Sequence, residues 1–464
     1  MRAAHMHRCL IALAMLLAGT AQAAPNDPYA GSSGSWGQAY RDQWGLPAIH
    51  WQAKLAARSP REVLVAVIDT GLDYYHPDLV DGNLYYNPGE VLNGRDDDAN
   101  GYVDDLIGWN FVDGNGNPWD RAGHGTLVTG IIAATTGNGK GIAGMAPNAR
   151  IMPLKVLNFI GHGHSSRVAE AIYYAASKGA RIINLSLGGE SPSKAILRAV
   201  DYAARNKVLI VVAAGNAGHE VAQPRYLDLP NVITVAATDT ANRRAGFSNF
   251  GPAIDVSAPG VDILSLRARR TDVAYVAEVE GYKPEQGFIG KDAHYYRANG
   301  TSFAAPFVTG AAALILGRNP QLDPGSIKRM ILQSAHDIGD PGVDQETGYG
   351  LLDLPAALKA DAKHFVDARI TGVGVINLNN QLFVRVTGIA RADRFDKAWV
   401  EVGHGDKPGA WKRASGTITA PVALGVLEDL PADMFDAPGR WTLRLTVAHA
   451  DGSRREARRT LDIN

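Results

Sequence analysis

Short apolar runs alternate with longer amphipathic stretches over most of the chain. The apolar runs are rich in β-branched residues, and each ends in Gly, Ser, Asn or Asp. They occupy residues 63–71, 180–189, 208–216 and 231–239. Runs this short and this uniformly apolar are typical of parallel strands that are buried on both faces.

The stretches between these runs have a helical period. Residues 166–179 place Val168, Ile172 and Ala175 on one face and end at a glycine suited to terminate a helix. A second stretch begins at Ser193, a good N-cap residue. Strands that alternate with helices predict an α/β fold, in which a doubly wound parallel sheet is covered by helices on both faces.

Around residue 363 the pattern changes. Short alternating strands with turn signals at close intervals replace the helical units. These strands are expected at residues 381–387, 397–403, 421–430 and 439–452. The spacing is typical of a small antiparallel β-sandwich of the immunoglobulin or fibronectin type. We therefore predict an α/β domain at 24–362 and a β-sandwich domain at 363–464.

The N-terminus has the form of a secretory signal. Basic residues come first, an apolar core covers about residues 9–18, and Ala21-Gln22-Ala23 follows as a cleavage site. We predict a signal peptide at 1–23 and a secreted or periplasmic protein. The core is too short to span a bilayer, and no later run of about 18 apolar residues follows, so no stable membrane insertion is expected. Cys9 is the single cysteine, so the exported chain folds without disulfides.

Composition narrows the class of protein without defining it. The chain has 464 residues, of which 46% are hydrophobic and 20% charged, with a net charge of −1. These values describe an ordinary globular protein and exclude an electrostatic partner such as nucleic acid. We expect a monomer. A basic run at 454–459 is expected on an edge strand, as a solvated face.

Polar residues with catalytic chemistry stand where the predicted strands end or helices begin. Asp69 lies near the end of the first run, and Asn216 ends the third. His124 follows a glycine at the start of a helix of small residues. Ser302 opens another such helix, with Thr301 as its expected N-cap. Sites in open parallel sheets form at the carboxyl ends of the strands, so these side chains are candidates for one site.

A carboxylate, an imidazole and a hydroxyl are the parts of a serine hydrolase. The hydroxyl attacks, the imidazole takes and returns its proton, and the carboxylate orients the imidazole and stabilises its cation. An Asn amide can supply an oxyanion donor beside the backbone N–H of the serine. Taken singly, each residue also fits a structural role, such as a turn cap or a packed loop residue. The order Asp, His, Ser, with each at a strand end or helix start, is one of the few known triad orders.

Four ordered motifs carry a family resemblance. The stretches "VAVIDTGLDYYHPDL", "GHGTLVTG", "AAGNAG" and "GTSFAAP" resemble the aspartate, histidine, oxyanion and serine motifs of the subtilisin-like serine peptidases, the subtilases of peptidase family S8. The resemblance covers about residues 26–359. It implies that Asp69 orients the imidazole, that His124 is general base and acid, that Ser302 is the nucleophile, and that Asn216 is the side-chain oxyanion donor.

The resemblance also implies a substrate site and a reaction. The stretch Ser186-Leu187-Gly188-Gly189 resembles the strand edge that pairs with the substrate backbone. The implied activity is that of an exported serine endopeptidase that hydrolyses polypeptide substrates through an acyl-enzyme. Two alternatives are kept: a serine hydrolase acting on esters or transferring acyl groups, and a catalytically silent or latent binding protein on the subtilase fold. Residues 24–62 leave little room for the folded inhibitory propeptide of many relatives, so we expect none.

A calcium loop is predicted at 93–105. Oxygen-bearing side chains alternate from Asp96, and Gly101 permits a sharp turn, as at the opening of an EF-hand-like loop. The predicted metal ligands are Asp96, Asp98, Asn100, Tyr102, Asp104 and Asp105. The alternative is an acidic, solvated insertion. Structural Ca²⁺ is favoured because clustered carboxylates otherwise repel each other, and because a disulfide-free exported protein gains stability from a bound cation.

Two further candidate metal sites are weaker. Asp78 and Asn138 fall where many relatives bind a second calcium ion. His162 and His164 stand two residues apart but have no third ligand in the sequence, so a solvated loop near the substrate edge is the preferred interpretation.

Overall fold

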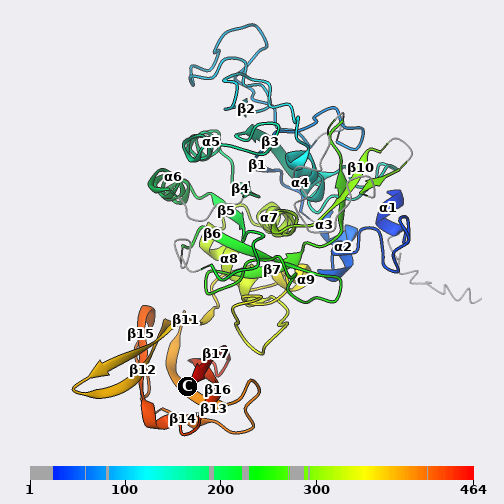
Figure 1. The fold of residues 1–464 in the computed structure, drawn as a ribbon. Helices are drawn as coiled ribbons and strands as arrows, with labels where there is room; N and C mark the ends of the chain where they lie inside the picture. The colour runs from blue at the N-terminus through cyan, green and yellow to red at the C-terminus, as the bar shows by residue number, and fades with distance from the viewer. Residues whose placement is uncertain are drawn as a thin grey trace, which may run out of the picture.

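The computed structural model describes residues 25–57, 59–79, 83–187, 193–221, 229–269, 271, 287–290, 293–414 and 416–463. The predicted signal peptide lies outside the described residues. Within them, an α/β part comes first along the chain and a β part follows it (Figure 1).

Seven parallel strands form the central sheet. They are β1 (Val63–Asp69), β2 (Trp109–Asn110), β3 (Ala149–Lys155), β4 (Ile182–Leu185), β5 (Leu209–Ala213), β6 (Val232–Thr238) and β7 (Val256–Pro259). Their order is β2-β3-β1-β4-β5-β6-β7, and every neighbouring pair is parallel. All residues of β4, β5 and β6 are buried, which explains their continuous apolar runs. The predicted α/β fold class is confirmed.

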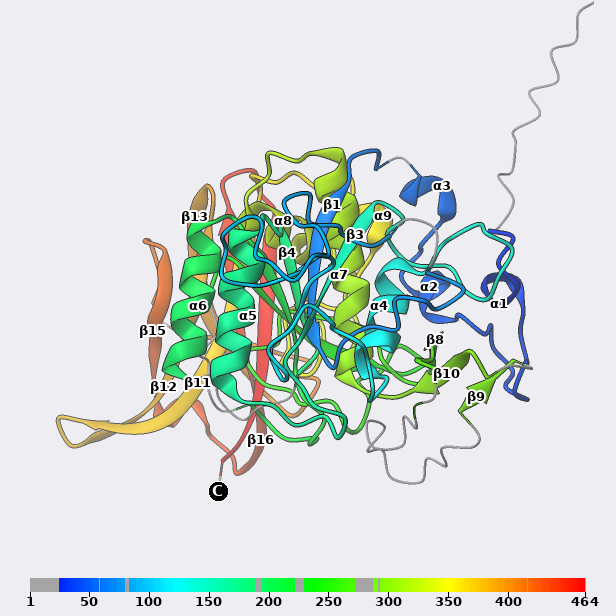
Figure 2. The same ribbon diagram turned by 90° about the horizontal axis from the view of Figure 1, so that it is seen from above.

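Helices cover both faces of this sheet. The helices of the described residues are α1 (Pro28–Gly31), α2 (Gly45–Ala48), α3 (Ala53–Ala56), α4 (His124–Ala133), α5 (Ser165–Ser177), α6 (Lys194–Arg205), α7 (Thr301–Arg318), α8 (Pro324–Gln333) and α9 (Leu354–Ala357). Helices α5 and α6 lie side by side on one face, and α4 and α7 lie on the other (Figures 1 and 2). Ser193 caps α6 as predicted, because its side chain accepts a hydrogen bond from Ile196 N at 3.3 Å.

Helix α7 is the central helix of the fold. Among the described residues it is the one helix long and apolar enough to cross a membrane by length and composition, and 89% of it is buried inside the protein. No such run was expected from the sequence, because Thr, Ser, Gly, Pro and Arg lower the mean hydropathy of this helix. A helix that is buried all round needs small residues where neighbouring elements approach closely.

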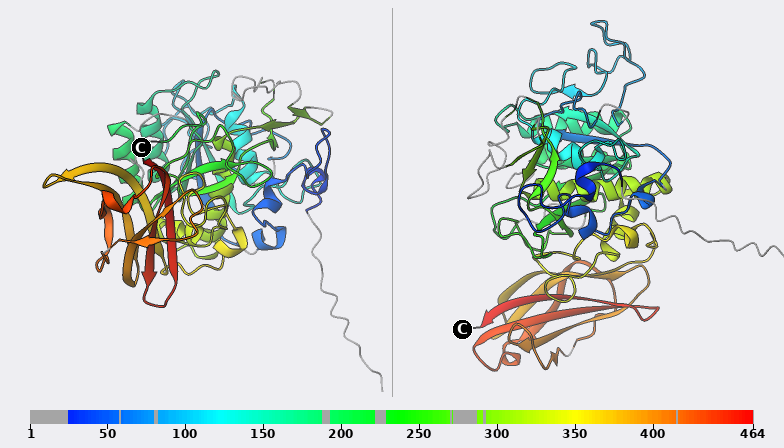
Figure 3. Two further views of the ribbon diagram at one scale, coloured as in Figure 1. Left: turned by 60° about the horizontal axis from the view of Figure 1, so that its bottom comes forward. Right: turned by 90° about the vertical axis from the view of Figure 1, so that its right-hand side faces the viewer.

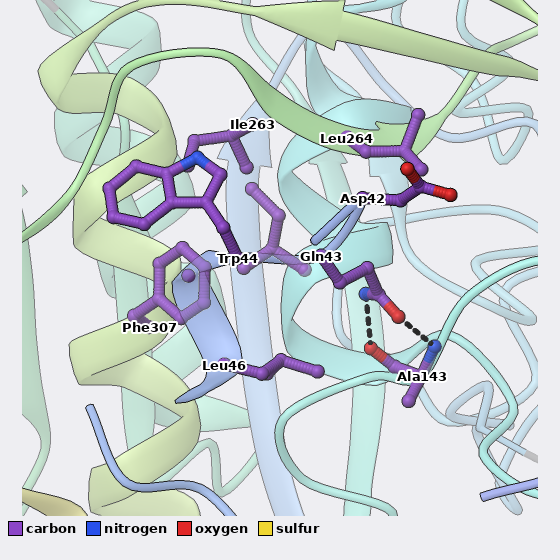
Figure 4. A pocket seen from close by; sticks show the side chains of 10 residues that line it. Asp42, Gln43, Trp44, Leu46, Ala143, Ile263, Leu264 and Phe307 are labelled. Atoms are coloured by element: carbon purple, nitrogen blue, oxygen red, sulfur yellow. Dashed lines mark hydrogen bonds between the residues drawn. The ribbon is translucent and has the colours of Figure 1, made fainter. Parts of the chain in front are cut away.

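The N-terminal segment packs against α7. Trp44 lies beside Phe307 in a small, largely apolar pocket (Figure 4). Gln43 fixes this segment, since its Nε2 donates to Ala143 O at 2.9 Å and its Oε1 accepts from Ala143 N at 2.8 Å. A Cβ atom at Gly45 would lie 2.6 Å from Phe307 Cζ, so a glycine is required for this close approach.

The remaining strands are antiparallel. A small sheet is formed by β8 (Ile263–Leu266), β9 (Phe288–Ile289) and β10 (Tyr295–Ala298). The C-terminal strands are β11 (Val366–Leu378), β12 (Gln381–Ala392), β13 (Phe395–His404), β14 (Lys412–Arg413), β15 (Val422–Pro431), β16 (Gly439–His449) and β17 (Arg454–Ile463), with the short 3₁₀ helix η3 (Ala432–Met434).

The C-terminal strands form two sheets, β11-β12-β15 and β14-β13-β16-β17. Buried residues of both sheets, Val386 and Leu443 among them, share one apolar core. The β part lies as a separate layer against the α/β part (Figure 3). The predicted antiparallel β domain is confirmed, while its boundary at residues 362 and 363 stays a prediction.

Strand β17 joins the two parts. Val343 N donates to Glu456 O at 2.8 Å, and Arg458 N donates to Val343 O at 3.1 Å. Arg455 also donates to Gln333 O at 3.2 Å. The basic run therefore lies on an edge strand, as expected, but it packs against the α/β part and does not form a solvated face. Covering the edge in this way removes a site for unwanted strand pairing.

Candidate active site

Asp69 is the last residue of β1 and is completely buried. It therefore lies at the carboxyl edge of the parallel sheet, where the chain turns away. Gly71 follows with a φ of 113°, and a Cβ atom there would lie 2.3 Å from Pro118 O. The missing side chain lets this turn lie against the segment that contains Pro118 and Trp119. A buried carboxylate needs a hydrogen-bonding partner, which α4 provides.

The first residue of α4 is that partner. The N-cap, Gly123, has a φ of 102°, which favours glycine. His124 Nδ1 lies 2.7 Å from Asp69 Oδ1 and 2.9 Å from Asp69 Oδ2. Burial lowers the pKa of His124, but the charge and hydrogen bond of Asp69, together with the charge of Asp120, outweigh burial and raise the pKa above 6.5. With Nδ1 held by Asp69, Nε2 is the nitrogen available for proton transfer.

Ser302 is the second residue of α7 and is half-buried. The Phe303 ring next to it lies 5.4 Å from the His124 ring, so the two helix N-termini meet. The Ser302 hydroxyl donates to Ser186 O at 3.1 Å. Catalytic hydrogen bonds are often formed only when substrate is bound, so rotation of this hydroxyl toward the imidazole is the expected change.

Asn216 is held against the start of α7 by its acceptor oxygen. Its Oδ1 accepts from both Thr301 N and Thr301 Oγ1 at 2.9 Å. This leaves Nδ2 as the free end of the amide. The N-cap of α7 is Gly300, with a φ of 153°, and not Thr301 as expected from the sequence, because the Thr301 hydroxyl is used in contacts with Asn216 and Gly215. A Cβ atom at Gly300 would lie 3.3 Å from Asn216 Nδ2.

Two of the predicted substrate-binding residues follow β4. Ser186 Oγ donates to Ser302 O at 2.7 Å. Leu187 lines a groove that also reaches Asn216, His162 and His164. Gly188 and Gly189 lie outside the described residues. Both histidines are exposed, and neither belongs to a metal-type cluster in the described part of the chain.

Three carboxylates meet beside the predicted calcium loop. Oxygen atoms of Glu90, Asp98 and Asp105 lie within 4.8 Å of one another. Glu90 Oε1 accepts from Asp97 N at 2.9 Å and Asp98 N at 3.0 Å. Its Oε2 is buried and has no hydrogen bond to a described residue. Oxygen donors in this arrangement fit a calcium ion. Glu90 was missed because it precedes the alternating Asp and Asn pattern.

A lysine shares this carboxylate cluster. Lys178 Nζ forms ion pairs with Asp98 and, at 3.2 Å, with Asp105. Burial raises the pKa of Asp98, but hydrogen bonds from Lys178 and Asn87 outweigh burial, and the pKa is lowered. A cation bound between these carboxylates would have to displace Lys178.

The other predicted loop ligands have backbone or structural contacts. Asp96 accepts from Asn100 N at 3.0 Å and Gly101 N at 2.7 Å. Asp104 accepts from Gly94 N at 3.0 Å. The Asn100 amide donates to Asp105 at 2.9 Å, and the Tyr102 hydroxyl donates to Glu170 at 3.3 Å. Asp98 and Asp105 are the predicted ligands that the fold brings together.

Asp78 and Asn138 are in contact, as their paired prediction requires. Asn138 Nδ2 donates to Asp78 Oδ1 at 2.8 Å. Burial raises the pKa of Asp78 to about 6, and the nearby charge of Asp27 contributes. Asp27 accepts from Gly137 N and Asn138 N, so two buried carboxylates converge on this turn.

The fold, the Asp69–His124 pair and the adjoining Ser302 fit the class of serine hydrolases built on a parallel α/β sheet. The chain matches the model of the Subtilase family over residues 60–350 and belongs to this family. A thermophilic serine proteinase of Bacillus sp. (strain AK1) is 40% identical over 281 residues, which are 60% of this chain and 57% of the relative. Fervidolysin of Fervidobacterium pennivorans is 33% identical, covering 87% of this chain and 57% of its own length.

Smaller relatives are matched almost completely. Thermitase of Thermoactinomyces vulgaris is 33% identical, covering 68% of this chain and 94% of thermitase. A solved structure titled as a lanthipeptide protease aligns with a TM-score of 0.54 and 27% identity, over 68% of this chain and 94% of that one. The chain spans 57% of the length of both the Bacillus proteinase and fervidolysin.

Proposed function

We propose that this protein is an exported serine endopeptidase that hydrolyses polypeptides with Ser302, His124 and Asp69 as its triad. The observation that carries the proposal is the Asp69–His124 contact of 2.7 Å at the helix end that adjoins Ser302. Membership of the subtilase family supports it. Export rests on the signal pattern at 1–23 and places the protein in the periplasm or outside the cell.

In the proposed first half-reaction, Ser302 Oγ attacks the scissile carbonyl carbon while His124 Nε2 accepts the hydroxyl proton. Asp69 stabilises the imidazolium formed. The negative oxygen of the tetrahedral intermediate accepts hydrogen bonds from Asn216 Nδ2 and Ser302 N. When the C–N bond breaks, His124 returns the proton to the leaving amine, and Ser302 holds the acyl group as an ester.

Water completes the reaction. His124 takes a proton from water as the water oxygen attacks the ester carbonyl. The second tetrahedral intermediate uses the same two donors. Collapse of that intermediate releases the carboxylic acid, and the proton returns to Ser302 Oγ. In the free protein the Ser302 hydroxyl donates to Ser186 O. This hydrogen bond would break before the first step, when the hydroxyl turns toward His124.

We infer that Ca²⁺ stabilises the loop that contains Asp98 and Asp105. Glu90, Asp98 and Asp105 would hold the ion, with Asn100 beside them. When bound, the ion would neutralise the converging carboxylates and cross-link the parts of the loop that carry Glu90, Asp98 and Asp105. A second cation site is proposed at Asp78, Asn138 and Asp27. A cation there would offset the free-energy cost of burying two carboxylates.

Digestion of casein and of matched peptide and ester substrates tests the proposed activity. An endopeptidase produces internal cleavage of casein and turns over the peptide substrate. An ester hydrolase turns over only the ester, and a silent binding protein turns over neither. Loss of both activities in Ser302→Ala, with an unchanged melting temperature, assigns the reaction to this site.

A further inference from the structure

Two histidines and two aspartates converge at one end of the C-terminal β part, far along the chain from the catalytic residues. His364 lies two residues before the start of β11, where the chain enters this part. Asp393 lies in the turn between β12 and β13. His449 ends β16, and Asp451 lies in the turn that follows. Three separate segments thus meet at a mixed imidazole and carboxylate cluster.

His449 is the buried member, and a carboxylate lies beside each of its nitrogens without forming an aligned hydrogen bond to Nε2. The residue is 2% exposed. Its Nδ1 lies 2.8 Å from Asp451 Oδ1 and accepts a hydrogen bond from Asp451 N at 3.1 Å, so Asp451 holds this side of the ring. Its Nε2 is buried and forms no hydrogen bond to a described residue, although Asp393 Oδ1 lies 3.2 Å away. A buried nitrogen in this state is costly unless something else binds it.

Ligand atoms of His364, His449 and Asp451 lie within 4.8 Å of one another, a spacing that suits a small cation. His364 Nδ1 lies 3.9 Å from Asp393 Oδ1 and 3.8 Å from Asp451 Oδ2. The separation of His449 Nε2 and Asp393 Oδ1 is 3.2 Å. Atoms bound tetrahedrally to one ion at about 2.0–2.1 Å lie roughly 3.3 Å apart. An ion bound by both His449 Nε2 and Asp393 Oδ1 would lie to one side of the line that joins these two atoms. This position would explain why the two atoms are close without being aligned as a hydrogen bond.

We propose that His364 and His449, with the neighbouring carboxylates of Asp393 and Asp451, bind a divalent transition-metal ion, with Zn²⁺ as the best match. Asp451 orients His449 through Nδ1, in the carboxylate–histidine–metal arrangement common at such sites, and its Oδ2 is available as a fourth ligand. Two imidazoles favour zinc over the hard calcium ion, which prefers oxygen ligands.

The bound ion would join the interdomain junction to two turns of the β part. His364 is two residues from the start of β11, and Phe365 N already donates to Asp393 Oδ1 at 2.8 Å. Arg329 of α8 lies over the Phe365 ring, so the same junction contacts the α/β part. A metal here would stabilise the attachment of the C-terminal part in a chain whose one cysteine lies in the predicted signal peptide.

Cobalt(II) is the probe for this site, because ligation by nitrogen and oxygen in a tetrahedral field gives strong visible absorption bands. The full-length chain is used as Ser302→Ala to prevent autolysis, stripped of transition metals, kept in Ca²⁺ and titrated with CoCl₂. We expect bands that saturate at one equivalent and disappear when ZnCl₂ is added.

Variants assign the ligands. His364→Ala, at a partly exposed position, is expected to weaken Co²⁺ binding at least about tenfold, the scale on which even outer-shell partners act. His449→Gln is expected to abolish the bands. His50→Ala is the matched control, because His50 pairs with the single carboxylate of Asp353 at 3.1 Å, and it should bind Co²⁺ as the parent does.

Absence of visible bands at one equivalent would overturn the proposal. So would an unchanged Co²⁺ affinity in His364→Ala, or bands that His124→Ala removes, since these would place the ion elsewhere. His364→Ala decides the matter if His449→Gln fails to fold. The titration is read in a catalytically inactive background, so its outcome is independent of the proposed peptidase activity.

Discussion

Asp69 Oδ1 lies 2.7 Å from His124 Nδ1, although 55 residues separate them in the chain. The end of β1 fixes the carboxylate, and the start of α4 fixes the imidazole. Neither side chain needs to move for Asp69 to hold the ring. The pair is therefore arranged before substrate binds, which is the condition for efficient proton transfer.

Replacing Asp69 by Asn tests that pair. We expect Asp69→Asn to lower kcat by about 10⁴, as the same change does in another serine peptidase triad, because the imidazole is no longer held in the required tautomer. The measurement is kcat on a peptide substrate, with a melting curve to show that the fold persists. Unchanged turnover in a folded variant would exclude Asp69 from the mechanism.

The pH dependence follows from the raised pKa of His124. The base must be neutral to accept the Ser302 proton, so kcat/KM should fall as pH drops through the pKa of His124. Because Asp69 and Asp120 raise that pKa, the acidic limb should have its midpoint above 6.5. Asp69→Asn should move the midpoint to lower pH in its residual activity. A wild-type midpoint well below 6.5 would contradict the assignment.

Two variants of Asn216 separate the role of its side-chain N–H donor from the role of its side-chain oxygen acceptor. Asn216→Ala removes both, whereas Asn216→Asp keeps the oxygen that Thr301 N contacts and removes the donor. We expect each variant to lose about 10²–10³ in kcat, the figure for an oxyanion-hole asparagine in subtilisin, a member of this family. If Asn216→Asp retained full turnover, the role of Asn216 would be to anchor α7 and not to bind the oxyanion.

The two parts of the protein share a buried ionic network. Arg369 of β11 is 5% exposed and donates to Asp255 at 2.9 Å and Asp367 at 3.2 Å. Lys328 of α8 donates to Asp255 at 2.9 Å. Arg369→Met leaves both carboxylates with one cation fewer. Removing one partner of a buried ion pair usually costs about 3–5 kcal/mol. Because Lys328 still pairs with Asp255, we expect the free energy of unfolding to fall by about 3 kcal/mol, the lower end of that range.

Urea unfolding measures this loss, and a second arginine provides the control. Arg385 on β12 forms two hydrogen bonds of 2.8 Å with Asp429 but is 36% exposed in its side chain. Arg385→Met should have a small effect, because water screens exposed pairs. Equal destabilisation by Arg369→Met and Arg385→Met would show that the buried ion pair contributes no more to stability than the exposed one.

Calcium removal tests the proposed loop site. EDTA should lower the melting temperature, and CaCl₂ should restore it, because an ion that binds the folded state stabilises it by mass action. Glu90→Gln and Asp98→Asn should each reduce the calcium-dependent shift. Asp201→Asn, at an exposed α6 pair with Arg205, should leave the shift unchanged. A melting temperature insensitive to EDTA would argue against structural calcium.

The sequence predicts the parts of the fold whose pattern is set by burial alone. Strands β1, β4, β5 and β6 are continuous apolar runs because both of their faces are covered. Strand β3 was not predicted, because Arg150, Pro153 and Lys155 interrupt its pattern. It is nevertheless paired on both sides, with β1 and β2, so tertiary packing overrides local preference.

The candidate site shows the same limit. The motifs place Asp69, His124 and Ser302 at element ends, and parallel topology brings those ends together. Glu90 has no motif, and only the folded loop places it beside Asp98 and Asp105. The hydrogen bond from Ser302 to Ser186 O depends on a side-chain rotamer, which sequence spacing does not determine.

Covalent labelling of Ser302 tests the central claim most directly. The protein without residues 1–23 and its Ser302→Ala variant are treated with a fluorophosphonate and measured by intact and peptide mass spectrometry. An activated nucleophile gives one adduct, located on Ser302 and absent from the variant. A folded, calcium-loaded protein that forms no adduct, or forms one elsewhere, would contradict the proposed triad.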